Sequence, residues 1–343
     1  MTFKTPNFSI VFLSALVLAV LTGCGGGGGG QTTSTTAPVF TPATANLQVA
    51  LAASSYSAGS EELAAFNLLN FERNRCGFGL LRQNLQLDAA AKSHADYQIL
   101  NNTVTHTEDF SNTGFTGKLP SDRILAKNYL GAGAVTDEIV AYTGTAFKTG
   151  LGENGIRGLL SAPYHLRGLM GGYRDIGTSV RSSADLGSAM PAVYLQIDAA
   201  YKANEGPQLP GSNDVNTYPC EGTSGVNARL NNESPNPVPN RDLSVNPLGS
   251  VVYIAVRVGN TLVITNVAMI ELSTGHAVTI RAPVTAANDP YAPCQEGCFK
   301  SHQAYVAADS PLQANAAYQV LINGTNNGTA FSRVFTFTTG SSS

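Results

Sequence analysis

Four short segments in the first half of the chain carry the side chains best suited to chemistry. Histidine and carboxylate groups transfer protons and bind metal ions near neutral pH. Ser161 stands four residues before His165, a spacing that could serve a Ser–His hydrolase, but no G-x-S-x-G motif surrounds it, which disfavours that reaction. In chain order the segments are Thr105-His106-Thr107, Ser121-Asp122-Arg123, Asp137-Glu138-Ile139-Val140 and Ser161-Ala162-Pro163-Tyr164-His165.

The five cysteines are a second reactive set. Cys24 belongs to the leader described below, and the remaining four cysteines are an even number, which is typical of disulfides in an oxidising compartment. Sequence alone allows three pairings of Cys76, Cys220, Cys294 and Cys298. The last two are close enough to close a small loop, and the first two would then pair across a very long one. Metal binding is the alternative, but the chain has no pair of C-x-x-C units.

A leader precedes these residues. Lys4 supplies positive charge, residues 8–20 are almost wholly apolar, and Leu21-Thr22-Gly23-Cys24 follows directly. The apolar run is shorter than the roughly 20 residues of a membrane-spanning helix and suits a signal peptide. The tetrapeptide has the pattern of a bacterial lipobox, whose cysteine thiol accepts diacylglycerol. We predict a signal peptide over residues 1–23 and lipid on Cys24, with an ordinary secretory signal as the alternative.

Lipid on Cys24 would hold the protein on a membrane, because two or three acyl chains anchor stably. The predicted location is extracytoplasmic, on the cell membrane or the outer membrane. Gly25, rather than aspartate, after the cysteine fits outer-membrane delivery. A glycine run and a Thr, Ser and Pro-rich stretch follow, so residues 24–55 are predicted to be a flexible tether.

Composition limits the remaining choices. The chain has 343 residues, room for about two domains, with 13% charged residues and a formal net charge of -3. It contains no basic cluster that could meet phosphates, which argues against nucleic acid as a partner.

The reactive segments need a scaffold, and the first folded region is predicted to mix helices and strands. Ser60 is a candidate N-cap for a helix whose apolar stripe includes Phe66 and Leu69. Further helices are predicted from Asp88 to about Leu100, from Ser121 or Asp122, from about Ala134 to Phe147 and from about Gly155 to Leu160, and strands at 175–180 and 193–197.

Beyond Asn231–Asn246, which is rich in proline and asparagine, the apolar period becomes two. Asn323-Gly324 and Asn327-Gly328 are turn signals. Short strands at this spacing predict an antiparallel sandwich of about 100 residues. The strand candidates are 251–258, 261–267, 277–282, 318–322 and 334–338.

The order of these segments resembles the CAP superfamily, the SCP-like extracellular proteins, in its bacterial form. Residues 68–73 read LLNFER against the family's LLNxER, and residues 87–95 read LDAAAKSHA against LxxxAxxHA. The family's SHT, DR, GENIA and WMNSPGHR segments follow, and the four reactive segments stand in their places. The resemblance runs from about Ser60 to about Ile197 and implies an α/β/α sandwich.

Carried over residue by residue, the resemblance places His106, Glu138 and His165 in a central cleft as ligands of a divalent cation, zinc or calcium. Two imidazoles and one carboxylate leave room for a water, whose pKa a metal would lower. Without metal the three groups could hydrogen-bond each other. Histidines satisfied by main-chain carbonyls, and a solvated Glu138, are the structural alternatives.

The chain departs from the family pattern at several positions. Asp137 and Ile139 flank the matching glutamate in place of glycine and asparagine. Ala162 stands where eukaryotic members carry a second glutamate, so the four-ligand cluster is incomplete. A literal Gly-Glu-Asn occurs at 152–154; we interpret it as a decoy, with Glu153 as the alternative cleft acid.

The fold class predicted from these features is α+β, a CAP-like α/β/α sandwich followed by an all-β Ig-like sandwich. The close of the chain, from Tyr318 to Thr339, resembles bacterial Ig-like modules. The predicted domains are 56–225 (CAP-like), 226–246 (linker) and 247–340 (Ig-like).

Two functions remain at this stage. The first is a surface-anchored lipoprotein whose cleft binds a lipid, a protein or a cell-envelope ligand. The alternative is a metal-assisted hydrolase acting on extracytoplasmic peptide or cell-wall material, with Glu138 as general base. The missing acid at Ala162 and the altered segment around Glu138 weaken the cleft as a catalyst and favour binding.

Overall fold

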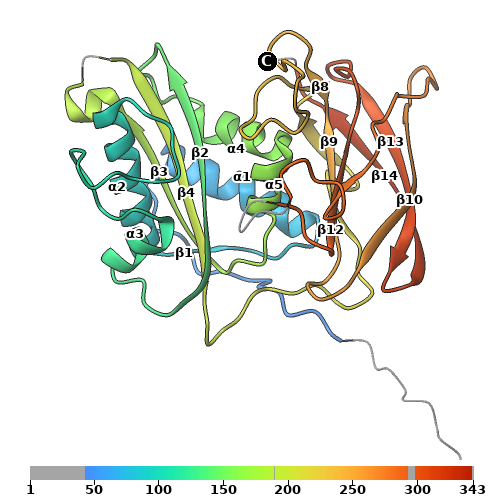
Figure 1. The fold of residues 1–343 in the computed structure, drawn as a ribbon, viewed down its shortest axis with the longest axis horizontal. Helices are drawn as coiled ribbons and strands as arrows, with labels where there is room; N and C mark the ends of the chain where they lie inside the picture. Colours follow the sequence, from blue (N-terminus) through green and yellow to red (C-terminus); the bar gives the residue numbers. More distant parts are fainter. Residues whose placement is uncertain (1–42, 189, 293–297, 342–343) are drawn as a thin grey trace, which may run out of the picture. The chain divides into compact units, whose positions relative to one another are not determined.

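The computed structural model describes residues 43–341, apart from 189 and 293–297, and mixes helices with several β-sheets (Figure 1). Helix α1 begins as the sequence predicts, because the Ser60 side chain accepts a hydrogen bond from the Leu63 N–H. Within the described residues, no helix has the length and apolar content to cross a bilayer.

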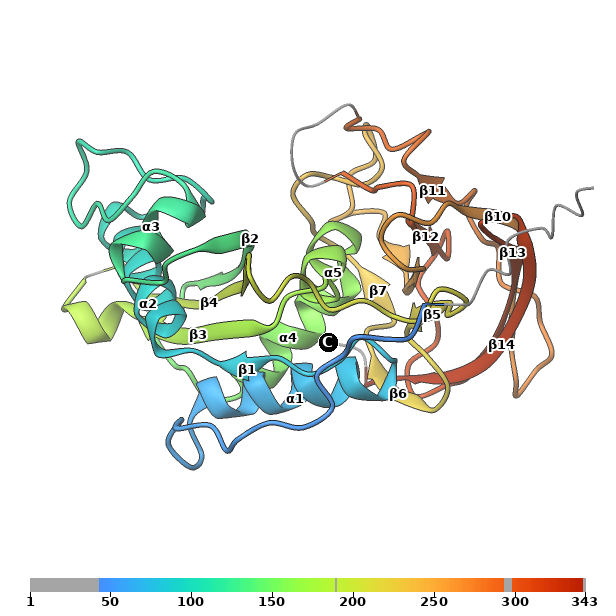
Figure 2. The same ribbon diagram turned by 90° about the horizontal axis from the view of Figure 1, so that it is seen from below.

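The first half of the chain builds a four-stranded sheet with helices on both faces (Figures 1 and 2). The strand order is β1-β3-β4-β2, so β2 is an edge strand. Helices α2 and α3 cover one face, and α1, α4 and α5 cover the other. The elements are α1 (Glu61–Arg75), β1 (Arg82–Gln83), α2 (Leu85–Asn101), α3 (Pro120–Ala126), β2 (Ala132–Thr143), α4 (Leu151–Ser161), α5 (Pro163–Leu169), β3 (Asp175–Ser182), a 3-10 turn (Ser183–Leu186) and β4 (Ala192–Lys202).

Two helix starts differ from the prediction by a few residues. Helix α2 begins at Leu85, where Asn84 caps it, and not at Asp88. The Asp88 carboxylate instead accepts the Tyr56 hydroxyl at 2.5 Å and the Thr178 N–H at 2.9 Å. It therefore ties the helix to strand β3. Helix α3 begins at Pro120, a residue favoured at the first helical position.

The helix predicted over 134–147 is wrong, because this stretch forms strand β2. Asp137 pairs with Arg123 of α3 on one face of the sheet. On the other face, Glu138 lies against Gly168 of α5, where an added Cβ would fall 1.8 Å from its Oε1. Adjacent acids buried on opposite faces remove the alternation of apolar and polar residues that would have indicated a strand.

The second half of the chain is almost entirely β-structure. Two four-stranded sheets, β10-β13-β14-β6 and β11-β12-β9-β5, contribute to one hydrophobic cluster that includes Val252, Val306 and Phe337. The strands are β5 (Asn216–Tyr218), β6 (Thr223–Val226), β7 (Arg229–Leu230), β8 (Leu248–Gly249), β9 (Val251–Ala255), β10 (Leu262–Glu271), β11 (Val284–Thr285), β12 (Gln303–Ala307), β13 (Ala317–Asn326) and β14 (Thr329–Thr339).

Two sequence signals of this half are wrong. Residues 277–282 form only isolated bridges, at Ala277 and Ile280. Asn323-Gly324 lies inside β13 and is not a turn. Asn327-Gly328 does form the turn between β13 and β14, where both residues have positive φ.

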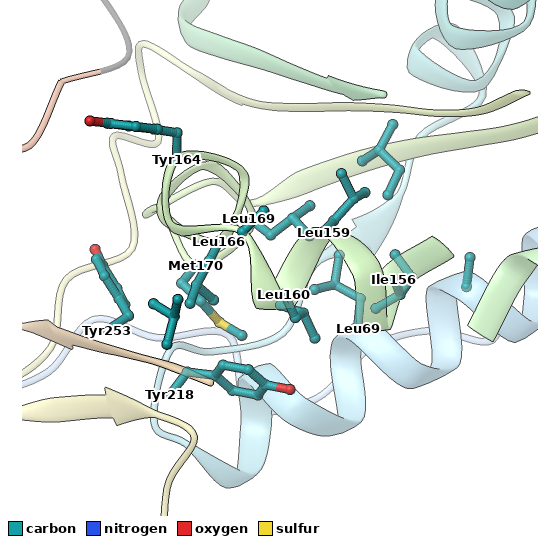
Figure 3. Close-up of a cluster of buried hydrophobic side chains, with 14 of the residues drawn as sticks. Leu69, Ile156, Leu159, Leu160, Tyr164, Leu166, Leu169, Met170, Tyr218 and Tyr253 are labelled. Atoms are coloured by element: carbon teal, nitrogen blue, oxygen red, sulfur yellow. The ribbon is translucent and has the colours of Figure 1, made fainter. Parts of the chain in front are cut away.

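The two halves share one hydrophobic core. All five residues of β9 are buried, and Tyr253 belongs to the same cluster as Leu69 of α1 and Ile156 of α4. Figure 3 shows part of this cluster around α1, α4 and α5. Strands β5 and β6 pair with strands of the second half although the predicted boundary follows residue 225. The domain limits themselves stay predictions.

A disulfide joins Cys76, at the end of α1, to Cys220, just before β6, with a Cα–Cα distance of 5.5 Å. It closes the longer of the two loops that the spacing favoured. Cys298 is also disulfide-bonded. Its predicted partner Cys294 lies outside the described residues, as does Cys24.

The end of the predicted tether is attached to the folded chain. Asn46 forms a bridge with Leu209, and the Gln48 side chain donates to the carbonyls of Leu80 and Arg174 at 2.8 Å each. The rest of the predicted tether, up to residue 42, lies outside the described residues.

Candidate functional site

A cleft of about 980 Å³ lies beside the free edge of β2. Its walls come from both halves of the chain, with residues 104–106 and 139–142 from the first half and residues 225, 227 and 229–234 from the second. Helices α4 and α5 also contribute residues, among them Gly158 and His165. The stretch predicted to be a linker therefore contributes to this cleft.

His106 lies at the cleft with its side chain 52% exposed. Its Nδ1 is 3.0 Å from Oδ1 of Asp137, and this hydrogen bond raises the pKa of the imidazole above its usual value. The other oxygen of Asp137 accepts from Nη2 of the buried Arg123 at 2.8 Å. Arg123 thus holds the carboxylate that orients the His106 ring.

His165 lines the same cleft and faces a different carboxylate. Its Nδ1 is 3.4 Å from Oε1 of Glu233, which also accepts the Tyr164 N–H at 2.7 Å. Burial lowers the pKa of His165, but Glu233 and the nearby Glu138 outweigh it, so the pKa is raised. Glu233 Oε2 is buried without a hydrogen-bond partner among the described residues.

Glu138 lies on a strand and is only 5% exposed, so it is not the solvated acid of the structural alternative. Its Oε1 accepts the Thr136 hydroxyl at 2.9 Å. Burial raises the pKa of Glu138 to about 6, against the opposing charges of His165 and His106. The three predicted cleft residues therefore interact electrostatically, although the cleft surface includes only the two histidines.

These residues do not fit a resident metal as they are arranged here. Among the described residues, no group of three or more histidine, cysteine, aspartate or glutamate side chains is placed to hold a metal ion. His106 and His165 turn Nδ1 to two different carboxylates. Zinc or calcium binding stays a prediction.

Other candidate residues have structural partners. The Ser161 hydroxyl donates to the Gly158 carbonyl at 2.7 Å, so it is not activated by His165. His94 is fully buried, with Nδ1 2.8 Å from Glu108 and Nε2 2.7 Å from the Thr105 carbonyl. Glu153 is exposed in the first turn of α4 and is not among the cleft residues.

Sequence reasoning missed two acids of this site. Asp137 stands in one of the four reactive segments but at a position where the family has glycine, and its place beside a candidate cleft residue is the signal that could have identified it. Glu233 stands in the proline and asparagine-rich stretch interpreted as a linker. A lone acid in such a stretch carries no signal of burial.

Comparisons with known proteins give limited matches. No known family model and no curated protein matches the chain. An outer surface protein from Borrelia burgdorferi has a TM-score of 0.33 and 16% identity, over 43% of this chain and 96% of that chain. An extracellular protein containing an SCP domain, from Bacillus anthracis str. Ames, has a TM-score of 0.33 and 18% identity, over 41% of this chain and 40% of that chain.

Proposed function

We propose that this chain is a lipid-anchored, extracytoplasmic binding protein, with a CAP-like first part and an Ig-like second part, whose cleft binds a cell-envelope or protein ligand. The observation that carries the proposal is the 980 Å³ cleft, whose surface is rich in polar side chains from both halves. Clefts of this size with convergent polar groups are the usual place for ligand binding.

The compartment and the anchor rest on separate observations. The Cys76–Cys220 disulfide suits an oxidising compartment. The apolar leader and the Leu-Thr-Gly-Cys segment support lipid on Cys24. Expression of the chain and its Cys24→Ser variant in a bacterial host, with labelled palmitate and membrane fractionation, tests the anchor. Equal label and equal membrane retention in the variant would contradict it.

Gly158 offers a direct test of the cleft. It lies on α4 at the cleft surface, and an added Cβ would meet no atom within 4 Å. Gly158→Tyr should therefore obstruct the cleft without disturbing the helix. Gly158→Ala is the matched control, which keeps the cleft open.

Two probes cover the ligand classes: muropeptides released from peptidoglycan, and a displayed library of random ten-residue peptides. The full chain in detergent micelles is tested against both. We expect at least one probe to bind the wild type and Gly158→Ala equally and Gly158→Tyr about tenfold more weakly. Binding that Gly158→Tyr leaves unchanged would refute the cleft as the binding site.

A hydrolase is the second candidate, and one observation favours it. His106 and His165 both line the cleft, and Nδ1 of each ring lies against a carboxylate oxygen. That pairing orients an imidazole and supports its protonated form, as a general base requires. Mass spectrometry of muropeptides incubated with the chain, or with its His106→Ala and His165→Ala variants, tests it. Equal amounts of hydrolysed product from all three proteins would exclude this role.

A further inference from the structure

The free edge of β2 runs along the cleft. Strand β2 is 12 residues long and, among the residues that the structure describes, pairs on one side only, with β4. Four consecutive residues, Ile139 to Tyr142, line the cleft. Because consecutive side chains of a strand point to opposite faces, a cavity that touches all four lies along the strand's edge.

The hydrogen-bond pattern shows which main-chain groups this edge presents. The Gly144 N–H donates to the Pro191 carbonyl at 2.8 Å, on the same register as the Tyr142–Val193 and Val140–Leu195 pairs. Hydrogen-bonded pairs alternate along an antiparallel ladder. The even-numbered residues of β2 therefore bond to β4, and the N–H and C=O groups of Ile139 and Ala141 point away from it.

Strand β3 gives an independent check of this alternation. If Leu195 bonds to β2, its register partner Val180 must turn its N–H away from β4. The Val180 N–H does so, donating to Glu62 Oε1 at 3.0 Å. The Thr178 N–H, two residues earlier, likewise donates to Asp88.

The outward groups of Ile139 and Ala141 have no hydrogen-bond partner among the described residues. Ile139 is only 7% exposed. Main-chain polar groups that are shielded from bulk water are costly unless something pairs with them. The unpaired main-chain groups of this edge can therefore form hydrogen bonds with the N–H and C=O groups of a ligand's main chain.

Other side chains of the cleft suit the same kind of ligand. Asn154, Asn231 and Asn232 are exposed side chains at the cleft surface. An asparagine amide both donates and accepts, as a peptide group does. Because these amides line the same cleft as the strand edge, a single extended chain in the cleft can pair with both.

We propose that an extended peptide segment of a partner protein adds to the free edge of β2 as a further strand, pairing with the main chain of Ile139 and Ala141. This ligand class rests on the cleft being the binding site, as proposed above. Strand addition is a general mode of peptide recognition, in which main-chain hydrogen bonds supply affinity.

Ala141→Pro is the decisive variant, with Ala141→Ser as its matched control. Proline removes the outward N–H, and a proline is tolerated on an edge strand when its N–H faces out. Peptides enriched from the ten-residue library on the full wild-type chain should bind Ala141→Ser equally and Ala141→Pro about tenfold more weakly. Equal binding to Ala141→Pro, or a library that yields no binder, would overturn the proposal.

N-methylation of the enriched peptide tests the pairing on the wild-type chain, and decides the matter if Ala141→Pro fails to fold. In a paired peptide only every second N–H faces β2. Methylation of those nitrogens should abolish binding, and methylation of the nitrogens in between should leave binding unchanged. Loss at every position, or at none, would refute strand addition.

Two further outcomes separate this proposal from its rivals. Binding that is lost in Gly158→Tyr but kept in Ala141→Pro would leave the cleft as the binding site and overturn strand addition. A wild-type dimer that Ala141→Pro makes monomeric in sedimentation would show that a second copy occupies the edge, and would also overturn it.

Discussion

The Glu233 carboxylate lies 3.4 Å from Nδ1 of His165, although 68 residues separate them along the chain. The first stands between β7 and β8, and the second on α5. Their contact makes the stretch after β7 part of the cleft wall. Because Glu233 raises the pKa of His165, that pKa depends on how the segment after β7 packs.

Glu233→Gln should lower the pKa of His165. The Glu233 hydrogen bond and charge raise that pKa, and the amide keeps an acceptor for the Tyr164 N–H while removing the charge. A titration of the histidine Cε1 protons by NMR measures the shift. Glu153→Gln, an exposed acid on α4, is the control and should leave His165 unchanged. A His165 titration that Glu233→Gln leaves in place would contradict the assigned contact.

Asp137→Asn should destabilise the fold and lower the pKa of His106. It removes the closer charged partner of the fully buried Arg123 guanidinium and leaves Glu108, 4.0 Å away, as the other; we expect a cost of about 3 kcal/mol. It also removes the negative charge of the hydrogen-bond partner that raises the His106 pKa. Urea unfolding and NMR titration report the two effects. The double variant Arg123→Met, Asp137→Asn should recover much of the lost stability, since the buried guanidinium is gone and Glu108 keeps its contact with His94.

The elements that the sequence predicted well are those whose signals are local. Ser60 caps α1 with its own side chain, and β4 opens with an apolar run, residues 192–195, that is buried between two neighbouring strands. The helix predicted over β2 was wrong because the two central acids of this strand have distant partners. Arg123 and His106 contact Asp137 on one face, and the charge of His165 acts on Glu138 on the other. No local pattern reports such partners.

The site was predictable only in part for the same reason. The two histidines could be placed by resemblance, and the structure brings both to one cleft. Their carboxylates, Asp137 and Glu233, depend on sheet pairing and on how residues 226–246 pack. The free edge of β2 depends on strand order, which no single segment encodes.

Two glycines should respond in opposite ways to alanine. In Gly177→Ala, the new Cβ would fall 2.0 Å from the carbonyl carbon of Leu87 and force α2 away from β3. We expect a loss of about 3 kcal/mol. Gly158→Ala meets open space on α4 and should gain up to about 1 kcal/mol. Thermal unfolding of both variants checks the contrast, and a stable Gly177→Ala would refute the close helix–sheet approach.

Loss of the Cys76–Cys220 disulfide should lower the free energy of unfolding by about 3–5 kcal/mol. The bond spans 144 residues, and restraining so long a loop removes much entropy from the unfolded chain. Urea unfolding of Cys76→Ala, Cys220→Ala without reductant measures the loss. With reductant, the unfolding curves of the wild type and the variant should coincide, because neither protein then has a disulfide. A difference that persists in reductant would assign the effect to packing.

Asp198 should give the stability of the fold a distinctive pH dependence. It is fully buried on β4 opposite Asp137, with Oδ2 unpartnered among the described residues, and burial raises its pKa to about 8. Asp137 raises the pKa further, while Arg123 and the Gln196 hydrogen bond oppose it. In the unfolded chain the group ionises near pH 4. The folded state therefore binds the extra proton between pH 4 and 8, and its stability falls as pH rises through that window.

Asp198→Asn keeps the shape of the neutral acid and cannot ionise. Its stability relative to the wild type should rise by about 1.4 kcal/mol per pH unit between pH 5 and 7, the slope of one proton. Asp185→Asn is the control, because Lys148 and the Ser182 N–H lower the pKa of Asp185 despite its partial burial. Its slope of opposite sign lies below about pH 4, so between pH 5 and 7 its stability curve should run parallel to that of the wild type. Urea unfolding at each pH gives the slopes. Parallel curves for Asp198→Asn and the wild type would show that Asp198 is ionised in the folded protein, with a partner that neutralises it.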